Sequence, residues 1–118
     1  MKKIYYLKTC STCQRINKAL NLPKDFTEQD LKTTPISASD LEALKSLSGS
    51  FEALFSKRAK LYKEMGLKDK ILKEADYRQY ILKHYTFLKR PVLVIKDQIF
   101  VGNSPKIIAA AKLALTNA

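Results

Sequence analysis

The chain has 118 residues, which is enough for one domain with an ordinary hydrophobic core. Its content of 46% hydrophobic and 28% charged residues excludes a disordered chain, and its two cysteines exclude a small disulfide-rich scaffold. The net charge of +11 suggests nucleic-acid binding, but only four of the 22 cations are arginines and the lysines are scattered. We therefore expect a solubility surface or an anionic partner, and no dedicated nucleic-acid interface.

The hydropathy pattern predicts neither a membrane span nor a signal peptide. The apolar stretch over 107–115 contains Lys112 and is far shorter than the roughly 20 residues of a spanning helix. The apolar run over 4–7 is also shorter than the about 7–15 residues of a signal-peptide core. We therefore expect a cytoplasmic protein, in which cysteines serve as thiols, metal ligands or redox catalysts.

The first third of the chain has a strand–helix–strand pattern. Residues 3–8 are aromatic and branched, which predicts a strand, and Cys10-Ser-Thr-Cys13 follows it directly. Helical spacing of apolar residues then predicts a helix over 14–22. A weaker strand is expected over 26–31, because this segment carries several polar residues.

The middle of the chain has helical periodicity from Ser37 for nearly fifty residues. Ser37 or Ser39 is expected to cap the first helix of this stretch. Gly66 is expected to end a later helix, and Asp76 is expected to cap the one that follows.

The end of the chain returns to strands. Residues 92–95 predict a buried strand, and 99–101 predict its hairpin partner. Ser104-Pro105 predicts the start of the last helix, with serine as N-cap and proline at the first helical position.

Together these elements predict an α/β fold with a small mixed sheet of about four strands, flanked by helices and interrupted by an all-helical subdomain. A strand followed by Cys-x-x-Cys at a helix start, in a βαβ context, is typical of thioredoxin-like proteins. We expect one domain whose thioredoxin-like part covers 1–35 and 88–118, with a helical insert over about 36–87.

The two cysteines are the strongest candidates for chemistry. A cysteine just before a helix faces unpaired backbone N–H groups and the positive end of the helix dipole, which favour the reactive thiolate. We therefore predict that Cys10 is the nucleophile. Cys13 lies one turn further on the same face, where a more buried and less acidic thiol is placed to attack a mixed disulfide on Cys10.

Two other interpretations of the cysteine pair stay open. The pair could be half of a zinc site, but zinc generally takes four ligands and His84 is the only histidine, so a second chain would be needed. The cysteines could also be two inert buried thiols. We expect no metal.

Basic residues and a proline complete the predicted site. Arg90 precedes Pro91 at the start of a strand, where proline is tolerated in any case. A guanidinium near Cys10 would favour the thiolate and could hold an oxyanion or a carboxylate. Arg58 is either part of this anionic site or one more charge on a solvated helix, and Lys8 adds positive potential two residues before Cys10.

Over nearly its whole length the chain resembles the ArsC/Spx family. Four segments carry the resemblance, in the order seen in that family: Tyr6-Leu-Lys-Thr-Cys-Ser-Thr-Cys-Gln-Arg15, Ser56-Lys-Arg-Ala-Lys-Leu-Tyr-Lys-Glu-Met-Gly-Leu67, Phe87-Leu-Lys-Arg-Pro-Val-Leu-Val94 and Phe100-Val-Gly-Asn-Ser-Pro105.

The resemblance implies a thioredoxin-like domain with a helical insert and a cis proline at Pro91 beside the cysteine loop. In arsenate reductases of this family the cysteine at the Cys10 position attacks arsenate, and glutathione and glutaredoxin complete the reduction. Two of the three arginines around the oxyanion match Arg58 and Arg90. The third falls near Gly102, where this chain has no arginine, and those enzymes usually lack a cysteine at the Cys13 position.

Two further branches of the family share features with the chain. One contains thiol reductases with the Val-Gly-x-Ser-Pro ending. The other contains Spx regulators, which bind the RNA polymerase α subunit and use Cys-x-x-Cys as a redox switch.

We therefore expect a thiol–disulfide oxidoreductase that acts on an oxyanion or a disulfide, with an Spx-like regulator as the alternative. Lys8, Ser11, Thr12 and Pro91 are expected at the substrate. Glutathione is the expected co-substrate, and glutathione or glutaredoxin is the expected reductant. No tightly bound cofactor is expected, and a monomer is the default.

Overall fold

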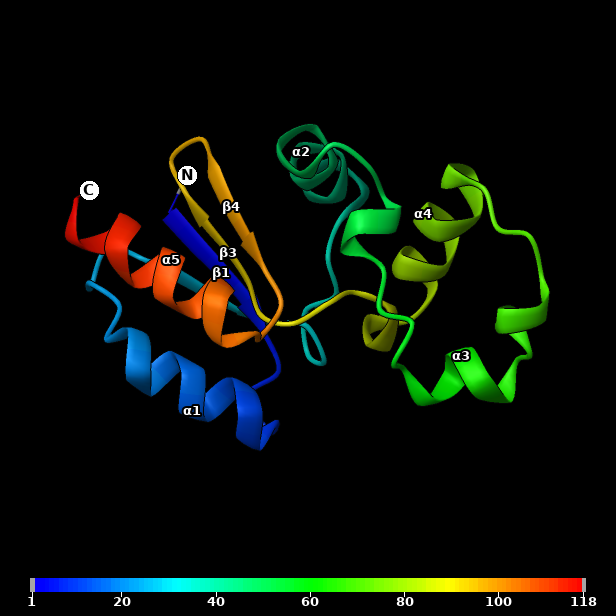
Figure 1. Ribbon diagram of the computed structural model, residues 1–118, viewed down its shortest axis with the longest axis horizontal. Coiled ribbons are helices and arrows are strands. Elements are labelled where there is room, and N and C mark those ends of the chain that lie inside the picture. Colours follow the sequence, from blue (N-terminus) through cyan, green and yellow to red (C-terminus); the bar gives the residue numbers. More distant parts are fainter. Residues whose placement is uncertain (1, 118) are drawn as a thin grey trace. The chain divides into compact units, whose positions relative to one another are not determined.

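The computed structural model describes residues 2–117, and the chain divides into two compact units (Figure 1). The first unit contains the residues up to Thr34 together with those from Arg90 onward, and the second unit is Pro35–Lys89. The second unit is built from helices and turns, in the region where the sequence predicts a helical insert over about 36–87.

A four-stranded mixed sheet forms the centre of the first unit, in the order β2-β1-β3-β4. Strand β1 pairs in parallel with β2 and antiparallel with β3, and β3 and β4 form a hairpin. The predicted mixed sheet of four strands is therefore confirmed. The strands are β1 (Lys2–Tyr6), β2 (Thr27–Asp30), β3 (Val92–Ile95) and β4 (Gln98–Val101).

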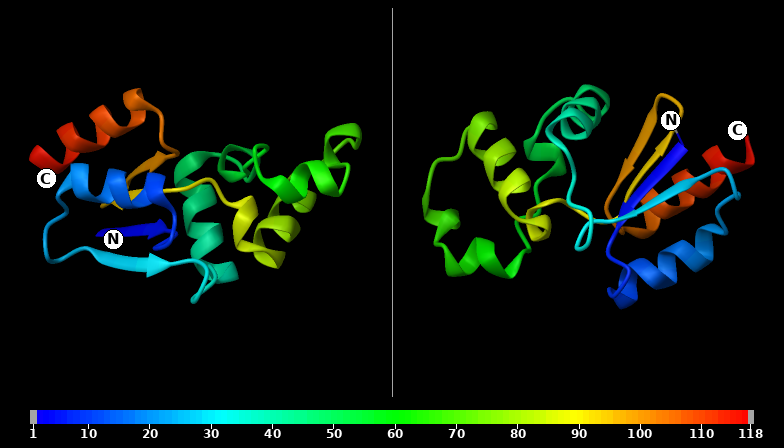
Figure 2. Two further views of the ribbon diagram at one scale, coloured as in Figure 1. Left: turned by 90° about the horizontal axis from the view of Figure 1, so that it is seen from below. Right: turned by 180° about the vertical axis from the view of Figure 1, so that it is seen from behind.

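Two helices, α1 (Ser11–Leu20) and α5 (Pro105–Thr116), lie side by side on one face of the sheet (Figures 1 and 2). Burial of each large aliphatic side chain between these layers contributes about 1.5–3 kcal/mol relative to exposure. This packing holds α1 against β1 and so limits where the loop between them can lie. The buried residues of this core are Ile4, Ile16, Leu20, Leu93, Ile95 and Ala111.

Helix α5 begins as its sequence predicts. The Ser104 hydroxyl accepts a hydrogen bond from the backbone N–H of Ile107 at 3.2 Å, and Pro105 occupies the first helical position. Proline is suited to this place because its missing N–H would have no partner within the helix.

The second unit is organised around Phe55. Its ring stacks on Phe87 with centroids 5.4 Å apart and lies 4.9 Å from the ring of Tyr77. The Ser56 N–H donates to the Phe87 carbonyl at 2.8 Å, which ties the middle of the unit to its end. The helices of this unit are α2 (Ala38–Ser48), η1 (Glu52–Leu54), α3 (Lys60–Glu64), η2 (Leu67–Asp69), α4 (Glu74–Lys83) and η3 (Tyr85–Phe87).

Two expectations about helix starts are settled by side-chain contacts. Ser37, and not Ser39, caps α2, because its hydroxyl accepts from the Asp40 N–H at 3.0 Å. The expectation that Asp76 is an N-cap is wrong. Helix α4 already begins at Glu74, and the Asp76 carboxylate instead reaches back to accept from the Lys73 N–H at 2.8 Å.

Two further boundaries differ from the prediction by a few residues. Helix α1 begins at Ser11, directly after Cys10, and not at residue 14. Helix α3 ends with Met65 as its C-cap, and Gly66 follows with a left-handed φ of 66°. Glycine adopts this conformation without the steric cost that a side chain would add.

Within residues 2–117, no helix has both the length and the apolar character that crossing a membrane requires.

Candidate active site

Cys10 is the N-cap residue of α1, at the end of a four-residue loop that leaves β1. Its backbone is extended, with φ −83° and ψ 121°, and its side chain is partly exposed. The side chain makes no capping hydrogen bond, and the first turn of α1 contains no acidic residue. The positive end of the helix dipole is therefore available to the Cys10 sulfur.

The pKa of the Cys10 thiol lies below its ordinary value, as the balance of opposing effects. Partial burial favours the neutral thiol and is the largest single effect. The effects that favour the thiolate together outweigh the effect of burial. They come from the Cys13 N–H, the Cys13 thiol, the Thr12 N–H and the Arg90 guanidinium. Cys10 is thus the more acidic of the two thiols.

Cys13 has the opposite character. It is 2% exposed and packs in the interior of the first unit. Burial raises the pKa of its thiol, and the neighbouring Cys10 raises it further, although the Leu7 backbone and Arg90 act in the opposite sense. Both cysteines are free thiols. The two sulfurs, one helical turn apart, therefore differ in both exposure and acidity.

Arg90 and Pro91 lie beside the cysteine loop because of the strand register. Val92 pairs with Tyr5, so the two residues before Val92 come next to the end of β1 where the loop begins. The Arg90-Pro91 peptide bond is cis, as the resemblance to thioredoxin-like proteins implies. Pro91 is buried, whereas Arg90 is partly exposed.

The Arg90 guanidinium has unused hydrogen-bonding capacity. It acts electrostatically on both cysteines, and favours the thiolate of each. Its Nη1 atom is buried and has no hydrogen-bond partner among residues 2–117. A buried donor without a partner is costly, so an anionic group that accepted from Nη1 would recover that cost.

The remaining predicted residues are distributed over both units. Lys8 and Ser11 are exposed and Thr12 is partly exposed, all within or next to the cysteine loop. Arg58 is exposed and lies in the turn before α3, not on a helix. The structure therefore assembles Cys10, Cys13 and the Arg90-Pro91 segment in the first unit, and it places Arg58 in the second.

Two residues of the loop's surroundings escaped the prediction from sequence. Asp30 and Gln14 both bond to the backbone of Lys8, at 3.2 Å and 2.6 Å. A signal for Asp30 was present, because the carboxyl ends of parallel neighbouring strands meet at one edge of a sheet. Asp30 ends β2, so it lies beside the loop that leaves β1.

The described residues contain no group of three or more histidine, cysteine and acidic side chains that could hold a metal ion. His84 lies in the second unit, where its Nδ1 accepts from the Thr86 N–H at 3.1 Å and so caps η3.

The mixed sheet, the two helices on one face and the cysteine at the start of α1 define a protein of the thioredoxin-like class. Residues 5–111 match the ArsC family, so the chain belongs to the ArsC family. The resemblance drawn from the sequence motifs is confirmed.

Solved structures share the fold at low sequence identity. An arsenate reductase from Vibrio cholerae has a TM-score of 0.77 at 23% identity, covering 93% of this chain and 96% of that chain. An arsenate reductase (ArsC) related protein from Brucella melitensis has a TM-score of 0.70 at 23% identity, covering 92% of both chains.

A similar sequence is the global transcriptional regulator Spx of Streptococcus pyogenes serotype M1. It is 23% identical over 104 residues, which cover 86% of this chain and 78% of the regulator. The chain is therefore similar both to proteins described as reductases and to proteins described as regulators.

Proposed function

We propose that this ArsC-family protein is a thiol–disulfide oxidoreductase in which Cys10 attacks the substrate and Cys13 resolves the intermediate. The observation that carries the proposal is the placement of the two thiols, with the partly exposed Cys10 as the N-cap of α1 and Cys13 buried one turn further along the helix. The opposite directions of their pKa shifts agree with this placement. A nucleophile requires thiolate at neutral pH, whereas a resolving thiol needs to be deprotonated only after the mixed disulfide has formed.

The proposed reaction with a disulfide has two exchange steps. The Cys10 thiolate attacks one sulfur of the substrate, the substrate S–S bond breaks, and the first thiol product leaves with a proton from solvent. The Cys13 thiol then loses its proton and attacks the Cys10 sulfur, which releases the second thiol product. The substrate gains two electrons and two protons, and Cys10 and Cys13 become a disulfide that two molecules of glutathione, or reduced glutaredoxin, convert back to thiols.

The proposed substrate carries negative charge near the reacting atom. The unpartnered Nη1 of Arg90 supports this part of the proposal, since it would donate to an oxyanion or to a carboxylate. Lys8, Ser11, Thr12 and Pro91 are proposed to contact the substrate around Cys10. By the family resemblance, Arg58 is also proposed as an anion-binding residue. Arsenate, another oxyanion and a glutathione-type disulfide all have the required charge.

A trapping experiment tests the division of roles between the cysteines. The reduced protein is incubated with glutathione disulfide and analysed by mass spectrometry. Turnover of a mixed disulfide of cysteine and glutathione, and of arsenate, is assayed separately with glutathione and glutaredoxin. We expect Cys13→Ser to accumulate a mixed disulfide on Cys10 and Cys10→Ser to lose turnover. Arg15→Gln, at an exposed position of α1 outside the proposed site, serves as the control substitution. Turnover that persists in Cys10→Ser would refute the enzymatic proposal.

A second candidate function is an Spx-like redox-sensing regulator that binds the RNA polymerase α subunit. It is favoured by the similarity to the Streptococcus pyogenes regulator over 86% of this chain and by the Cys-x-x-Cys pair. The regulator predicts capture of the purified α subunit in one oxidation state of the cysteines and not in the other. An absence of capture in both states would exclude it.

A further inference from the structure

The conformation of the Cys10 loop depends on the peptide backbone of Lys8. The loop between β1 and α1 consists of Leu7 to Cys10, and its own turn contributes one hydrogen bond, from the Cys10 N–H to the Leu7 carbonyl at 3.1 Å. The side chains of Lys8 and Thr9 are exposed. Packing of these two side chains therefore does little to fix the middle of the loop.

Two side chains from outside the loop hold this backbone at both of its polar groups. The Asp30 Oδ1 atom, at the end of β2, accepts a hydrogen bond from the Lys8 N–H at 3.2 Å. The Gln14 Nε2 atom, in α1, donates to the Lys8 carbonyl at 2.6 Å. The loop is thus connected to the two elements that follow it in the chain.

The Asp30 side chain is itself held by further hydrogen bonds, and Gln14 belongs to helix α1. The Asp30 Oδ1 atom also accepts from the Lys32 N–H at 3.3 Å, and its Oδ2 atom accepts from the Thr33 hydroxyl at 3.4 Å. The Gln14 backbone N–H donates to the Cys10 carbonyl at 2.9 Å, which is the bond that closes the N-terminal turn of α1. A displacement of Lys8 would therefore have to break contacts made by rigid elements.

We infer that Asp30 and Gln14 are positioning residues, which keep Cys10 at the N-terminus of α1 by holding the N–H and the carbonyl of Lys8. This inference rests on the proposed role of Cys10 as the attacking thiol. The thiolate is stabilised by N–H groups of the first turn, and these groups act only over hydrogen-bond distances. A loop released from its anchors moves the sulfur away from them and makes Cys10 less acidic.

The sign of the effect separates positioning from electrostatics at Asp30. A carboxylate near Cys10 disfavours the thiolate by like-charge repulsion, so removal of its charge alone would increase the acidity of Cys10. Loss of the anchor has the opposite effect. Asp30→Ala removes both charge and anchor, whereas Asp30→Asn removes the charge and keeps an oxygen that can accept from Lys8.

The test measures the rate of Cys10 alkylation by iodoacetamide between pH 4 and pH 9 in the reduced full chain, with the modified sulfur located by fragmentation mass spectrometry. For Asp30→Ala and Gln14→Leu we expect alkylation at acidic pH to slow by about three- to tenfold, because the rate follows the thiolate fraction. Asp30→Asn is expected to alkylate at least as fast as the unmodified protein. Glu28→Ala, which removes a carboxylate from the same strand, is the matched control and is expected to leave the profile unslowed.

Unslowed alkylation in both Asp30→Ala and Gln14→Leu would overturn the inference, as would equal slowing in Asp30→Asn. Thermal unfolding of each variant identifies a variant that fails to fold, and the two anchors lie on different elements, so the other variant still gives a result. Disulfide turnover is measured in parallel. Slowed alkylation without any turnover in the unmodified protein supports the positioning role and refutes the proposed enzyme, whereas Cys10-dependent turnover with unslowed alkylation does the reverse.

Discussion

At the scale of single residues, the two cysteines differ because their surroundings differ. Cys10 lies at the open end of α1, where N–H groups without helical partners face its sulfur, and Cys13 is enclosed by the core. Water stabilises an anion more than an apolar interior does, so the buried thiol resists ionisation. One helical turn is therefore enough to separate an acidic thiol from a protected one.

Arg90 provides a residue-scale prediction, because its guanidinium favours the Cys10 thiolate. In Arg90→Gln this attraction is lost, the pKa of Cys10 rises, and we expect alkylation of Cys10 by iodoacetamide at pH 6 to slow by about two- to fivefold. Arg90→Lys keeps a cation and is expected to recover part of the rate. The readout is the alkylation rate of the reduced protein as a function of pH.

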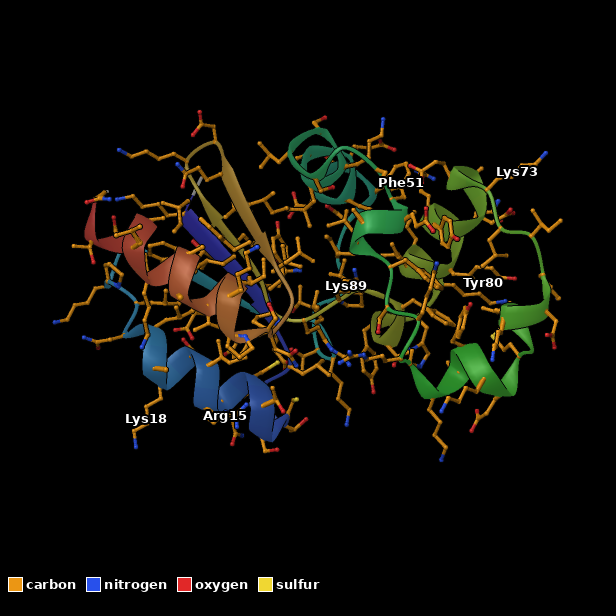
Figure 3. All side chains as sticks on the ribbon, viewed as in Figure 1. Arg15, Lys18, Phe51, Lys73, Tyr80 and Lys89 are labelled. Atoms are coloured by element: carbon orange, nitrogen blue, oxygen red, sulfur yellow. The ribbon has the colours of Figure 1, made fainter. Side chains whose placement is uncertain are left out.

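Arg15 supplies the control for this experiment. It is an exposed cation on α1, five residues after Cys10 (Figure 3), and Arg15→Gln removes the same charge. We expect Arg15→Gln to leave the alkylation profile nearly unchanged, since exposed charges at this range are screened by solvent and salt. Equal slowing in both variants would show that net charge, and not Arg90 itself, controls Cys10.

At the scale of elements, helix ends decide where each segment begins and which groups face outward. Helix α1 starts directly after Cys10 without an acidic residue in its first turn, so nothing in that turn neutralises the dipole before it reaches the sulfur. Helix α2 has the more usual arrangement, with a serine cap and Asp40 in the first turn. Because its first turn lacks an acidic residue, α1 can stabilise an anion at its N-terminus. The N-terminus of α2 is already satisfied by its own residues.

A comparison of Ser37 with Ser39 tests the cap of α2. Ser37→Ala removes the acceptor of the Asp40 N–H, and we expect a loss of about 1 kcal/mol in the free energy of unfolding. Ser39→Ala, within the first turn, is expected to change it by less than about 0.5 kcal/mol, as for most exposed positions. Urea unfolding of both variants gives the measurement, and equal losses would contradict the assignment of Ser37 as the cap.

At the scale of the whole molecule, the lowered pKa of Cys10 links folding to pH. A group whose pKa is lower in the folded state binds fewer protons there, so its contribution to stability is complete above the pKa of the unfolded state and is lost as pH falls through the folded pKa. Cys13 has a raised pKa and contributes with the opposite sign, so its contribution decreases as pH rises through the folded value.

Urea unfolding of the reduced protein and of Cys10→Ser between pH 5 and pH 9 isolates the contribution of Cys10. We expect the free energy of unfolding of the unmodified protein, minus that of Cys10→Ser, to increase with pH and to level off near the unfolded thiol value of about 8.5. Ser11→Ala, compared in the same way, is expected to give a difference that does not vary with pH. A pH-independent difference for Cys10→Ser would contradict the lowered pKa.

The excess of cations also belongs to this scale. The net charge of +11 is spread over exposed lysines and arginines, among them Arg15 and Lys18, which project outward from α1 (Figure 3). A field of this sign attracts anionic ligands, and salt screens the attraction. The positive net charge is therefore consistent with an anionic substrate.

Local sequence was sufficient to predict most of the elements and the position of Cys10 before a helix. The continuous apolar run over 92–95 predicted the strand, and Ser104-Pro105 predicted the cap of the last helix, because these depend on neighbours within a few residues. For α2 the sequence left Ser37 and Ser39 open, and the structure selected Ser37. The position of Cys10 before a helix likewise followed from the strand–cysteine–helix order. Asp76 shows the limit of this approach. Aspartate is a common N-cap residue, but Asp76 occupies the third position of a helix that begins at Glu74.

The tertiary structure determined which residues from distant segments come into contact. The pairing of Tyr5 with Val92 brings Arg90 and Pro91 to the cysteine loop, and the parallel pairing of β1 with β2 brings Asp30 to the backbone of Lys8. Sequence spacing does not show the Arg90 contact, and for Asp30 it indicates only the shared edge of the sheet, because strand register depends on the core that the strands share. The sequence by itself determined which sulfur precedes the first helix and indicated Arg90 as a candidate, whereas only the folded sheet brought Arg90 and Asp30 to the cysteine loop, because strand pairing joins segments that are distant in the chain.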